Sequence, residues 1–249
     1  MDNNSYVALS RAMGLRKKLD VIANNIANAN TTGFKSDSLL FSSFMERAHS
    51  KSNAENTAFT QDIATIIDET QGALSQTGNP LDVAINGNGW FGYMMEDGSN
   101  AFGRDGRFNI NSLGTLVNLS GNAVLDIGGG QINIAPEDID GINISTDGTI
   151  SNAAGNILAQ IGVFDVEDFQ NLERIGGGML KAQNNDVPLI PSQSVKIAQG
   201  FVEGSNVQSV VEITRLMDVQ KSYERSMKVI ENEHERIGKV LNRLGRSAS

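Results

Sequence analysis

Residues 212–244 read EITRLMDVQKSYERSMKVIENEHERIGKVLNRL, and they carry the clearest structural signal in the chain. Apolar side chains recur at alternating spacings of three and four residues, which is the heptad pattern of a helix that packs on another helix. A helix from Gln208 to Leu244 would be about 55 Å long, more than a compact domain of this size covers. The predicted seam consists of Ile213, Leu216, Gln220, Tyr223, Met227, Ile230, His234, Ile237, Leu241 and Leu244.

Two members of this seam are polar. Gln220 and His234 occupy positions where an apolar side chain would stabilise the packing more. Polar residues at such positions usually set the register or the choice of partner. The alternative is that both side chains face solvent, and the sequence leaves the two interpretations open.

A second heptad pattern lies near the N-terminus, where residues 4–28 contain no proline. A helix with a narrow apolar seam is marginal alone in water, so each of the two helices needs a partner. We expect them to pair with each other and to leave the longer one partly uncovered for neighbouring subunits. The N-terminal seam consists of Ala8, Ala12, Leu15, Leu19, Ile22 and Ile26.

The middle of the chain, residues 76–199, has a different character. Short β-branched runs such as Gln131–Ile134 are separated every few residues by Gly, Asn and Asp. The alternation Ile132-Asn133-Ile134 predicts a strand with one buried face, and three glycine sites, Asp105-Gly106, Gly128–Gly130 and Asp147-Gly148, predict turns with positive φ. We interpret this region as a mostly antiparallel β domain.

The fold class predicted is therefore α+β. Residues 1–30 and 200–249 form a terminal helical coiled-coil domain, and residues 76–199 form the β domain. Residues 31–75 are rich in Ser, Thr, Asn and Gln and fit neither pattern, so we expect an extended connector there.

Composition excludes several classes of function. The chain has 249 residues, with 20 Lys plus Arg against 29 Asp plus Glu and no Cys. A net charge of −9 disfavours nucleic acid as a partner, and the lack of Cys excludes disulfides and thiolate metal sites. No window is apolar enough for a membrane span, so no membrane insertion is expected, and Met1–Ser5 does not begin a cleaved signal peptide.

Catalytic and cofactor sites find no support. With only His49 and His234, the chain lacks the histidines for a three-histidine metal site or a Ser-His-Asp triad. Gly87–Gly92 matches G-x-G-x-x-G, but a turn follows within six residues in place of a helix, which disfavours dinucleotide binding. The acidic residues Glu137, Asp138 and Asp140 lack a full calcium-loop pattern. We predict no catalytic, cofactor-binding or metal-binding residue and no enzyme activity.

Three motifs resemble signatures of the bacterial flagellar rod, hook and hook-associated axial proteins. They are DVIANNIANANTTGFK at residues 20–35, GNPLDVAINGNGWF at residues 78–91, and QGFVEGSNV at residues 199–207. They occur in the family's order and span nearly the whole chain. The length and the opening residues 4–11 are most similar to the proximal-rod type, with the distal-rod type as the nearest competitor.

This resemblance implies a structural subunit of the basal-body rod that assembles helically through its paired terminal helices and transmits torque. It implies export by the flagellum's own secretion apparatus without a cleaved signal, a place in the rod that crosses the periplasm, and contacts with copies of itself and other rod proteins. Another axial subunit, or an unrelated secreted β-rich protein that self-associates, remains as an alternative.

Within the first motif, amides near a helix end can bond exposed backbone groups, and Gly33 allows a left-handed turn. An ordinary helix C-terminus would explain the same residues. We further hypothesise that Phe34 anchors the connector against the assembled tube. The residues assigned to assembly in this region are Leu15, Leu19, Ile22, Asn24, Asn25, Ile26, Asn28, Thr31, Gly33 and Phe34, with Asn30 as a further amide in the motif.

Overall fold

The computed structural model describes residues 3–46, 57–139, 141–166, 172–182, 188–192 and 196–247. The chain divides into two compact units. The helical unit comprises Met1–Ala27, Asp37–Ile66 and Gln208–Ser249, and the β unit comprises Asn28–Ser36 and Ile67–Val207. Each unit is built from segments that are distant in the sequence. The predicted α+β class is confirmed.

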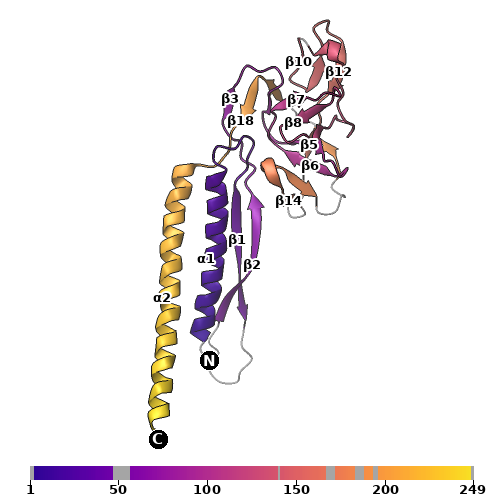
Figure 1. Ribbon diagram of the computed structural model, residues 1–249. Helices are drawn as coiled ribbons and strands as arrows, with labels where there is room; N and C mark the ends of the chain where they lie inside the picture. Colours follow the sequence, from indigo (N-terminus) through magenta and orange to yellow (C-terminus); the bar gives the residue numbers. More distant parts are fainter. Residues whose placement is uncertain are drawn as a thin grey trace. The chain divides into compact units, whose positions relative to one another are not determined.

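The helical unit holds two helices, α1 (Asn3–Ala27) and α2 (Ser209–Ser247). They run antiparallel, and α1 lies between α2 and a ribbon of two strands (Figure 1). At about 1.5 Å per residue, α1 is about 37 Å long and α2 about 58 Å. The longer helix therefore extends past the end of its partner.

The sequence of α2 suits a long helix because it contains no proline and is rich in Glu, Lys, Arg, Leu and Met. Glu212 lies in its first turn, where the positive end of the helix dipole favours a carboxylate. Along its exposed side, Arg236 pairs with Glu233 and Lys239 pairs with Glu235. Each such pair adds only about 0.3–0.5 kcal/mol, so α2 depends mainly on packing.

The ribbon beside α1 consists of β1 (Asp37–Glu46) and β2 (Thr57–Ile67), which pair with each other. These strands occupy about half of the segment, residues 31–75, for which the sequence predicts an extended connector. Their Phe, Ile and Thr residues favour strands, but the many Ser and Asn residues around them hide this preference in the sequence. The structure therefore differs from the predicted connector in that β1 and β2 are paired. This pairing depends on contact between two separate strands, so the pattern within either one does not predict it.

The β unit is built around one large antiparallel sheet. Among the described residues its strands follow the order β14-β15-β6-β5-β9-β8-β7, and β13 pairs with both β5 and β16. The strands are β5 (Trp90–Met94), β6 (Asn100–Gly103), β7 (Phe108–Ile110), β8 (Leu116–Asn118), β9 (Ala123–Val124), β13 (Val163–Asp165), β14 (Leu172–Arg174), β15 (Leu180–Ala182) and β16 (Ile190–Pro191).

Three smaller antiparallel sheets are formed by the other described strands of the unit. One has the order β10-β11-β12, with β10 (Asn143–Ile144), β11 (Thr149–Ser151) and β12 (Ile157–Gln160). The others pair β4 (Val83–Ile85) with β17 (Ile197–Gln199), and β3 (Leu74–Gln76) with β18 (Phe201–Glu203). In the described part of this unit, short 3₁₀ helices at Pro136–Asp138 and Gly176–Gly178 lie between strands. The last strands of the unit thus pair with its first ones.

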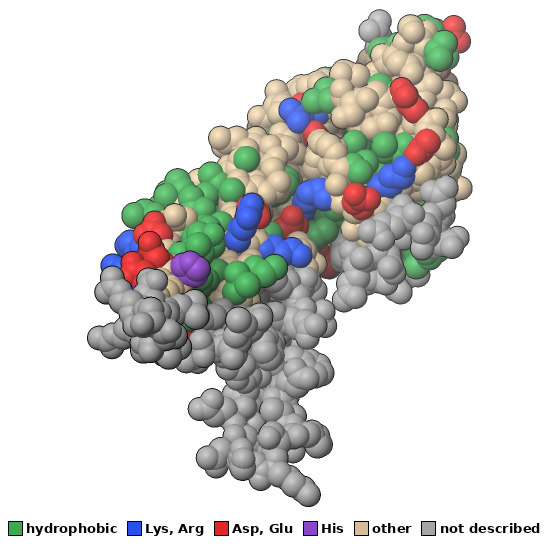
Figure 2. All heavy atoms as spheres, turned by 60° about the horizontal axis from the view of Figure 1, so that its bottom comes forward, with side chains coloured by type: hydrophobic (Ala, Val, Ile, Leu, Met, Phe, Trp, Pro, Cys, Tyr) green, Lys and Arg blue, Asp and Glu red, His purple; other side chains and the backbone are tan. Residues whose placement is uncertain are grey.

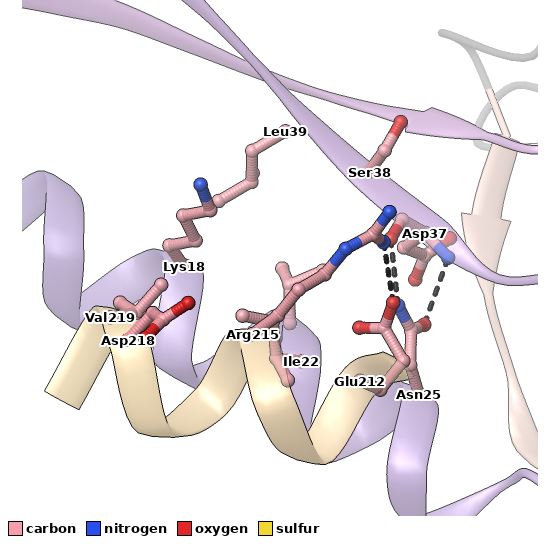
Figure 3. Close-up of a pocket in the computed structure, with 11 residues that line it drawn as sticks. Lys18, Ile22, Asn25, Asp37, Ser38, Leu39, Glu212, Arg215, Asp218 and Val219 are labelled. Atoms are coloured by element: carbon pink, nitrogen blue, oxygen red, sulfur yellow. Dashed lines mark hydrogen bonds and ion pairs between the residues drawn. The ribbon is translucent and has the colours of Figure 1, made fainter. Parts of the chain in front are cut away.

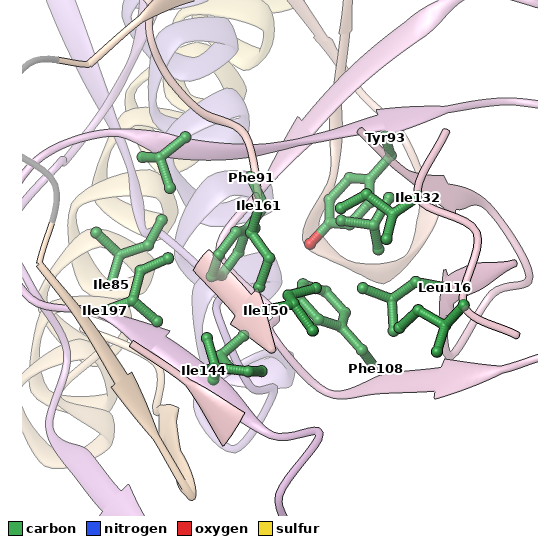
Figure 4. Close-up of a cluster of buried hydrophobic side chains, with 14 of the residues drawn as sticks. Ile85, Phe91, Tyr93, Phe108, Leu116, Ile132, Ile144, Ile150, Ile161 and Ile197 are labelled. Carbon is green, nitrogen blue, oxygen red and sulfur yellow. The ribbon is translucent and has the colours of Figure 1, made fainter. Parts of the chain in front are cut away.

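A core of aliphatic and aromatic side chains lies between these sheets (Figure 4). The predicted alternation at Ile132-Asn133-Ile134 is confirmed, because both isoleucines are buried and Asn133 is exposed. Phe91 and Phe108 meet edge to face at 5.2 Å between ring centroids. A second cluster contains Trp90, Phe102, Leu125, Phe164 and Leu180.

The predicted glycine turns are only partly correct. Gly129 and Gly148 have the positive φ that was expected. Gly106 does not have a positive φ. Glycine is needed there for another reason, because a Cβ would overlap the carbonyl oxygen of Val83. Glycine at this position therefore permits close backbone packing.

Candidate assembly surface

The N-terminal seam lies on the face of α1 that packs within the helical unit. Ala12 and Ile22 are buried. Leu15, Leu19 and Ile26 are half-buried, whereas Leu9 and Met13 on the other side of α1 are exposed. The residues assigned to this seam from spacing therefore share one face, and α1 uses it for contacts inside its own chain.

The C-terminal seam is divided. Leu216, Tyr223 and Ile230 are half-buried, while Ile213, Gln220, Met227, His234 and Ile237 are exposed. The most buried residues of α2 are Glu212, Val219 and Ser226, which recur every seven residues beside the predicted seam. The side chain of Leu241 lies outside the described residues.

This division has a simple geometric cause. The apolar stripe on α2 is wider than the strip that one neighbouring helix can cover, so α1 covers one edge of the stripe and leaves the other exposed. Ile213 is 47% exposed and Met227 is 43% exposed. Gln220 is exposed, and its Nε2 donates to Glu224 Oε1 on its own helix at 3.0 Å. On the face presented in Figure 2, hydrophobic side chains lie exposed among charged ones.

Asn25 is the motif amide with the clearest structural role. Its Nδ2 donates to the carbonyl oxygen of Asp37, and its Oδ1 accepts from the Asp37 backbone N–H, both at 2.9 Å. Asn25 is buried, and these bonds give both its amide nitrogen and its amide oxygen a partner and fix the start of β1 against α1.

Among the other polar residues of the motif, Asn28 forms a turn with Thr31. The Thr31 hydroxyl donates to Asn28 Oδ1, and the Thr31 backbone N–H donates to the Asn28 carbonyl oxygen. Asn24 and Asn30 are both exposed. Gly33 adopts φ +70, and its N–H donates to the carbonyl oxygen of Glu203 at 2.7 Å. The expected left-handed turn at Gly33 is therefore present.

Phe34 does not have the role hypothesised for it. It is 2% exposed, and the Arg174 guanidinium lies 4.5 Å above its ring. Arg174 also donates to the carbonyl oxygen of Lys35 at 2.8 Å. Phe34 is thus enclosed by its own β unit and does not present a surface to another subunit.

Sequence reasoning missed a buried ion triad. Glu203 Oε1 lies 2.7 Å from Lys35 Nζ, and Glu203 Oε2 lies 3.1 Å from Arg104 Nη1. All three side chains are buried. Lys35 also donates to the carbonyl oxygen of Thr70, and Gly72 N–H donates to Glu203 Oε1. The one available signal was the presence of Lys35 and Glu203 within the two terminal motifs.

Burial dominates the electrostatics of this triad. Desolvation lowers the pKa of Lys35, and the hydrogen bond and charge of Glu203 oppose that shift. The pKa of Arg104 is lowered for the same reason and is likewise supported by Glu203. The carboxylate therefore compensates two buried cations, and its loss would leave both without a counter-charge.

Asn206 links two chain segments beside the ion triad. Its Oδ1 accepts from the Ser36 backbone N–H at 2.7 Å, and its Nδ2 donates to the carbonyl oxygens of Asp68 and Thr70. One side chain of the C-terminal motif thus holds the N-terminal motif beside the segment that precedes β3.

Grooves are present in the helical unit, and two of them concern the paired helices. One is polar, has a volume of ≈ 470 Å³ and is bounded by α1, β1 and the first turns of α2 (Figure 3). The other, of ≈ 370 Å³, is largely apolar and lies between α1 and α2 at Leu19, Ala23, Leu216, Met217 and Gln220.

The remaining chemistry considered from the sequence leads to no site. No group of His, Asp and Glu side chains among the described residues is placed to hold a metal ion. Gly87 and Gly89 precede strand β5, so no helix start follows the G-x-G-x-x-G match. Within the described part of the chain, neither helix is long and apolar enough to cross a membrane.

Three family models match the chain. "Flagella basal body rod protein" matches residues 6–35, "Flagellar hook protein FlgE/F/G D1 domain" matches residues 84–152, and "Flagellar basal body rod FlgEFG protein C-terminal" matches residues 198–244. The flagellar basal-body rod protein FlgF of Caulobacter vibrioides is 39% identical over 99% of both chains. The chain belongs to the flagellar basal-body rod protein family.

Two further relatives place the chain within this family. The FlgF protein of Mesorhizobium japonicum is 34% identical over 98% of this chain and 99% of its own length. The FlgG protein of Agrobacterium fabrum is 38% identical over 85% of this chain and 88% of its own length. Rod proteins of this family are structural and are not enzymes.

The ion triad connects the three matched segments of this rod protein. Lys35 is the last residue of the first segment, Arg104 lies in the second, and Glu203 lies in the third. The signatures that identify the family are therefore in contact in the folded β unit, although they are far apart in the sequence.

Proposed function

We propose that this chain is a subunit of the proximal rod of the flagellar basal body, and that it assembles through its paired terminal helices with copies of itself and with other rod proteins. Relatives named FlgF support this assignment because their similarity extends over nearly their whole length and that of this chain.

The observation that carries the proposal is the uncovered half of the α2 seam. Ile213, Met227 and Ile237 are exposed on a helix whose other edge already packs against α1. Burial of one such side chain contributes up to about 1.5–3 kcal/mol, and the cost of association offsets part of that gain. A subunit with this surface is more stable in an assembly than alone.

Further parts of the role follow from this assignment. We infer that the subunit is exported by the flagellum's own secretion apparatus without a cleaved signal and is placed in the rod that crosses the periplasm. Packing of α1 and α2 against neighbouring subunits would connect successive copies along the rod, and this continuous contact would transmit torque.

A distal-rod role is the second candidate. The similarity to FlgG proteins favours it, since one of them is 38% identical to this chain. This FlgG match covers 85% of this chain and 88% of the relative, whereas the match to the Caulobacter vibrioides FlgF protein covers 99% of both. For this reason we prefer the proximal rod.

Deletion of the gene in its host, followed by electron microscopy of basal bodies and a swimming assay, tests the assignment. We expect loss of swimming and a rod that is absent or stops in its proximal part. A complete proximal rod without a distal rod would support the second candidate instead. An intact rod with normal swimming would exclude both.

Complementation separates assembly from folding. The variant Ile213→Asp with Met227→Asp places charges on the uncovered seam, and Thr214→Asp with Lys228→Asp places them one residue further along the same helix. All four residues are exposed. Both variants should keep the helical content of the wild-type monomer, but only the second should restore swimming. Equal restoration by both would contradict a role for the seam.

A further inference from the structure

The polar groove of the helical unit has an apolar floor and a charged rim. Val21, Ile22 and Val219 line it, and the last two are buried. The rim carries three carboxylates and two cations, from Asp37, Glu212, Asp218, Lys18 and Arg215. Figure 3 shows these side chains around one space between α1, β1 and α2.

One of the carboxylates is buried and covered by a side chain that is mostly in solvent. Glu212 is 6% exposed, and its Oε1 lies 2.6 Å from Arg215 Nη1. The Arg215 side chain is 63% exposed. A guanidinium with this much freedom can move aside or share the carboxylate at little cost, so Glu212 remains available to a second cation.

The lining is complementary to a Lys or Arg side chain. Such a side chain buries its methylene stem on apolar surface and keeps its charged head near polar groups. Val21, Ile22 and Val219 offer surface for the stem, and the Glu212 and Asp218 carboxylates offer partners for the head. Asp218 has no ion-pair partner within the described part of the chain.

The same unit presents cations that lack partners. Arg16 and Lys17 on α1 are exposed, and neither pairs with a carboxylate of any described residue. Neither lines the groove of its own chain. The helical unit therefore carries two adjacent cations without an ion-pair partner among the described residues and, on a different surface, a groove that contains the Glu212 and Asp218 carboxylates.

We propose that the groove binds the Arg16–Lys17 pair of a second copy of this chain. The inference rests on the proposed function, because it assumes that copies associate through the helical unit. The two surfaces differ, so the contact is head-to-tail. A head-to-tail contact repeats along an axis and builds an open helical assembly, as a rod requires.

Cross-linking of the full-length chain tests this contact. The protein contains no Cys, so each introduced thiol is the only one in its chain. Met13→Cys, one turn before Lys17 on α1, and Ser38→Cys, on the groove, replace exposed uncharged residues and leave the proposed charge pairs in place. Copies of the two variants are mixed under mild oxidation. Met13→Cys mixed with Lys228→Cys, which lies on α2 outside the groove, is the matched control.

We expect the 13–38 pair to form a disulfide-linked dimer about tenfold faster than the 13–228 pair, because docking raises the local thiol concentration. Equal rates for the two pairs would overturn the proposal. A faster 13–228 reaction would also overturn it, since α1 would then dock elsewhere on α2.

Charge reversal gives an independent readout of the same contact. Copies with Arg16→Glu and Lys17→Glu, or with Asp218→Lys, should self-associate about tenfold more weakly than wild type in sedimentation velocity. A mixture of the two variants should recover association, because opposite charges face each other again. If wild type associates and neither variant weakens it, the groove contact is wrong while the rod assignment stands. If the gene deletion leaves an intact rod, the assignment itself fails.

Discussion

The carboxylate of Glu203 lies 2.7 Å from the ammonium of Lys35, and both side chains are shielded from solvent. Lys35 ends the segment that follows α1, and Glu203 ends the strand that precedes α2. The β unit therefore holds the chain as it leaves one terminal helix and as it approaches the other. The same carboxylate also pairs with Arg104, which follows β6.

Glu203→Gln should destabilise the β unit strongly. The substitution keeps the shape of the side chain but leaves Lys35 and Arg104 buried without a counter-charge, which typically costs about 3–5 kcal/mol. Denaturant unfolding monitored by the fluorescence of Trp90, the only tryptophan, measures the effect. Glu173→Gln is the control, because Glu173 is exposed. Equal midpoints for the two variants would show that the triad contributes little.

Gly33→Ala should destabilise the β unit more than Gly78→Ala. The two glycines have φ +70 and φ +77, so both substitutions carry the left-handed penalty of about 1–2 kcal/mol. A Cβ at Gly33 would also overlap the backbone of Arg104 and Asp105, whereas nothing lies within 4 Å of one at Gly78. The overlap should add about 1–3 kcal/mol. Comparison of unfolding midpoints isolates this packing effect, and similar values would refute it.

Asn25→Ala should release the start of β1 from α1. It removes both hydrogen bonds to the Asp37 backbone at a buried site and should cost about 1–3 kcal/mol. Hydrogen exchange at the Asp37 amide should accelerate. Asn30→Ala, at an exposed position of the same motif, should leave that exchange unchanged. Unchanged protection in Asn25→Ala would argue that β1 is held by other contacts.

Alkaline pH should destabilise the β unit through Tyr93. Burial raises the pKa of Tyr93 above its usual value near 10, and its hydroxyl donates to the Asp105 carbonyl oxygen at 2.7 Å. Since the folded state holds this proton more tightly, the contribution is complete below pH 10 and is lost as pH rises further. Tyr93→Phe should cost about 0.5–1.5 kcal/mol at pH 7 and less above pH 10.

The measurement for this prediction is the unfolding free energy of wild type and Tyr93→Phe at pH 7 and at pH 11. The difference between the two proteins should shrink at the higher pH. A difference that stays constant would mean that Tyr93 does not ionise on unfolding in this range.

Local patterns were sufficient for much of this fold. The heptad spacings predicted α1 and α2, because a helical period of 3.6 residues places such side chains on one face whatever surrounds them. The alternation at Ile132–Ile134 predicted a strand with one buried face for a similar reason. The absence of proline and the glycine-rich turns separated the helical from the β regions. Each of these signals depends on neighbours within a few residues.

Contacts between distant residues were decided only by the tertiary structure. Spacing identified a seam that includes Ile213 and Met227, but it could not say which edge α1 covers, since that depends on how one helix rolls on the other. The pairing of β1 with β2 depends in the same way on a partner strand. Lys35, Arg104 and Glu203 are separated by 69 and 99 positions, and burial of three charges is stable only when all three meet. No local pattern encodes such a meeting, because its energy exists only after the chain has brought the three side chains together.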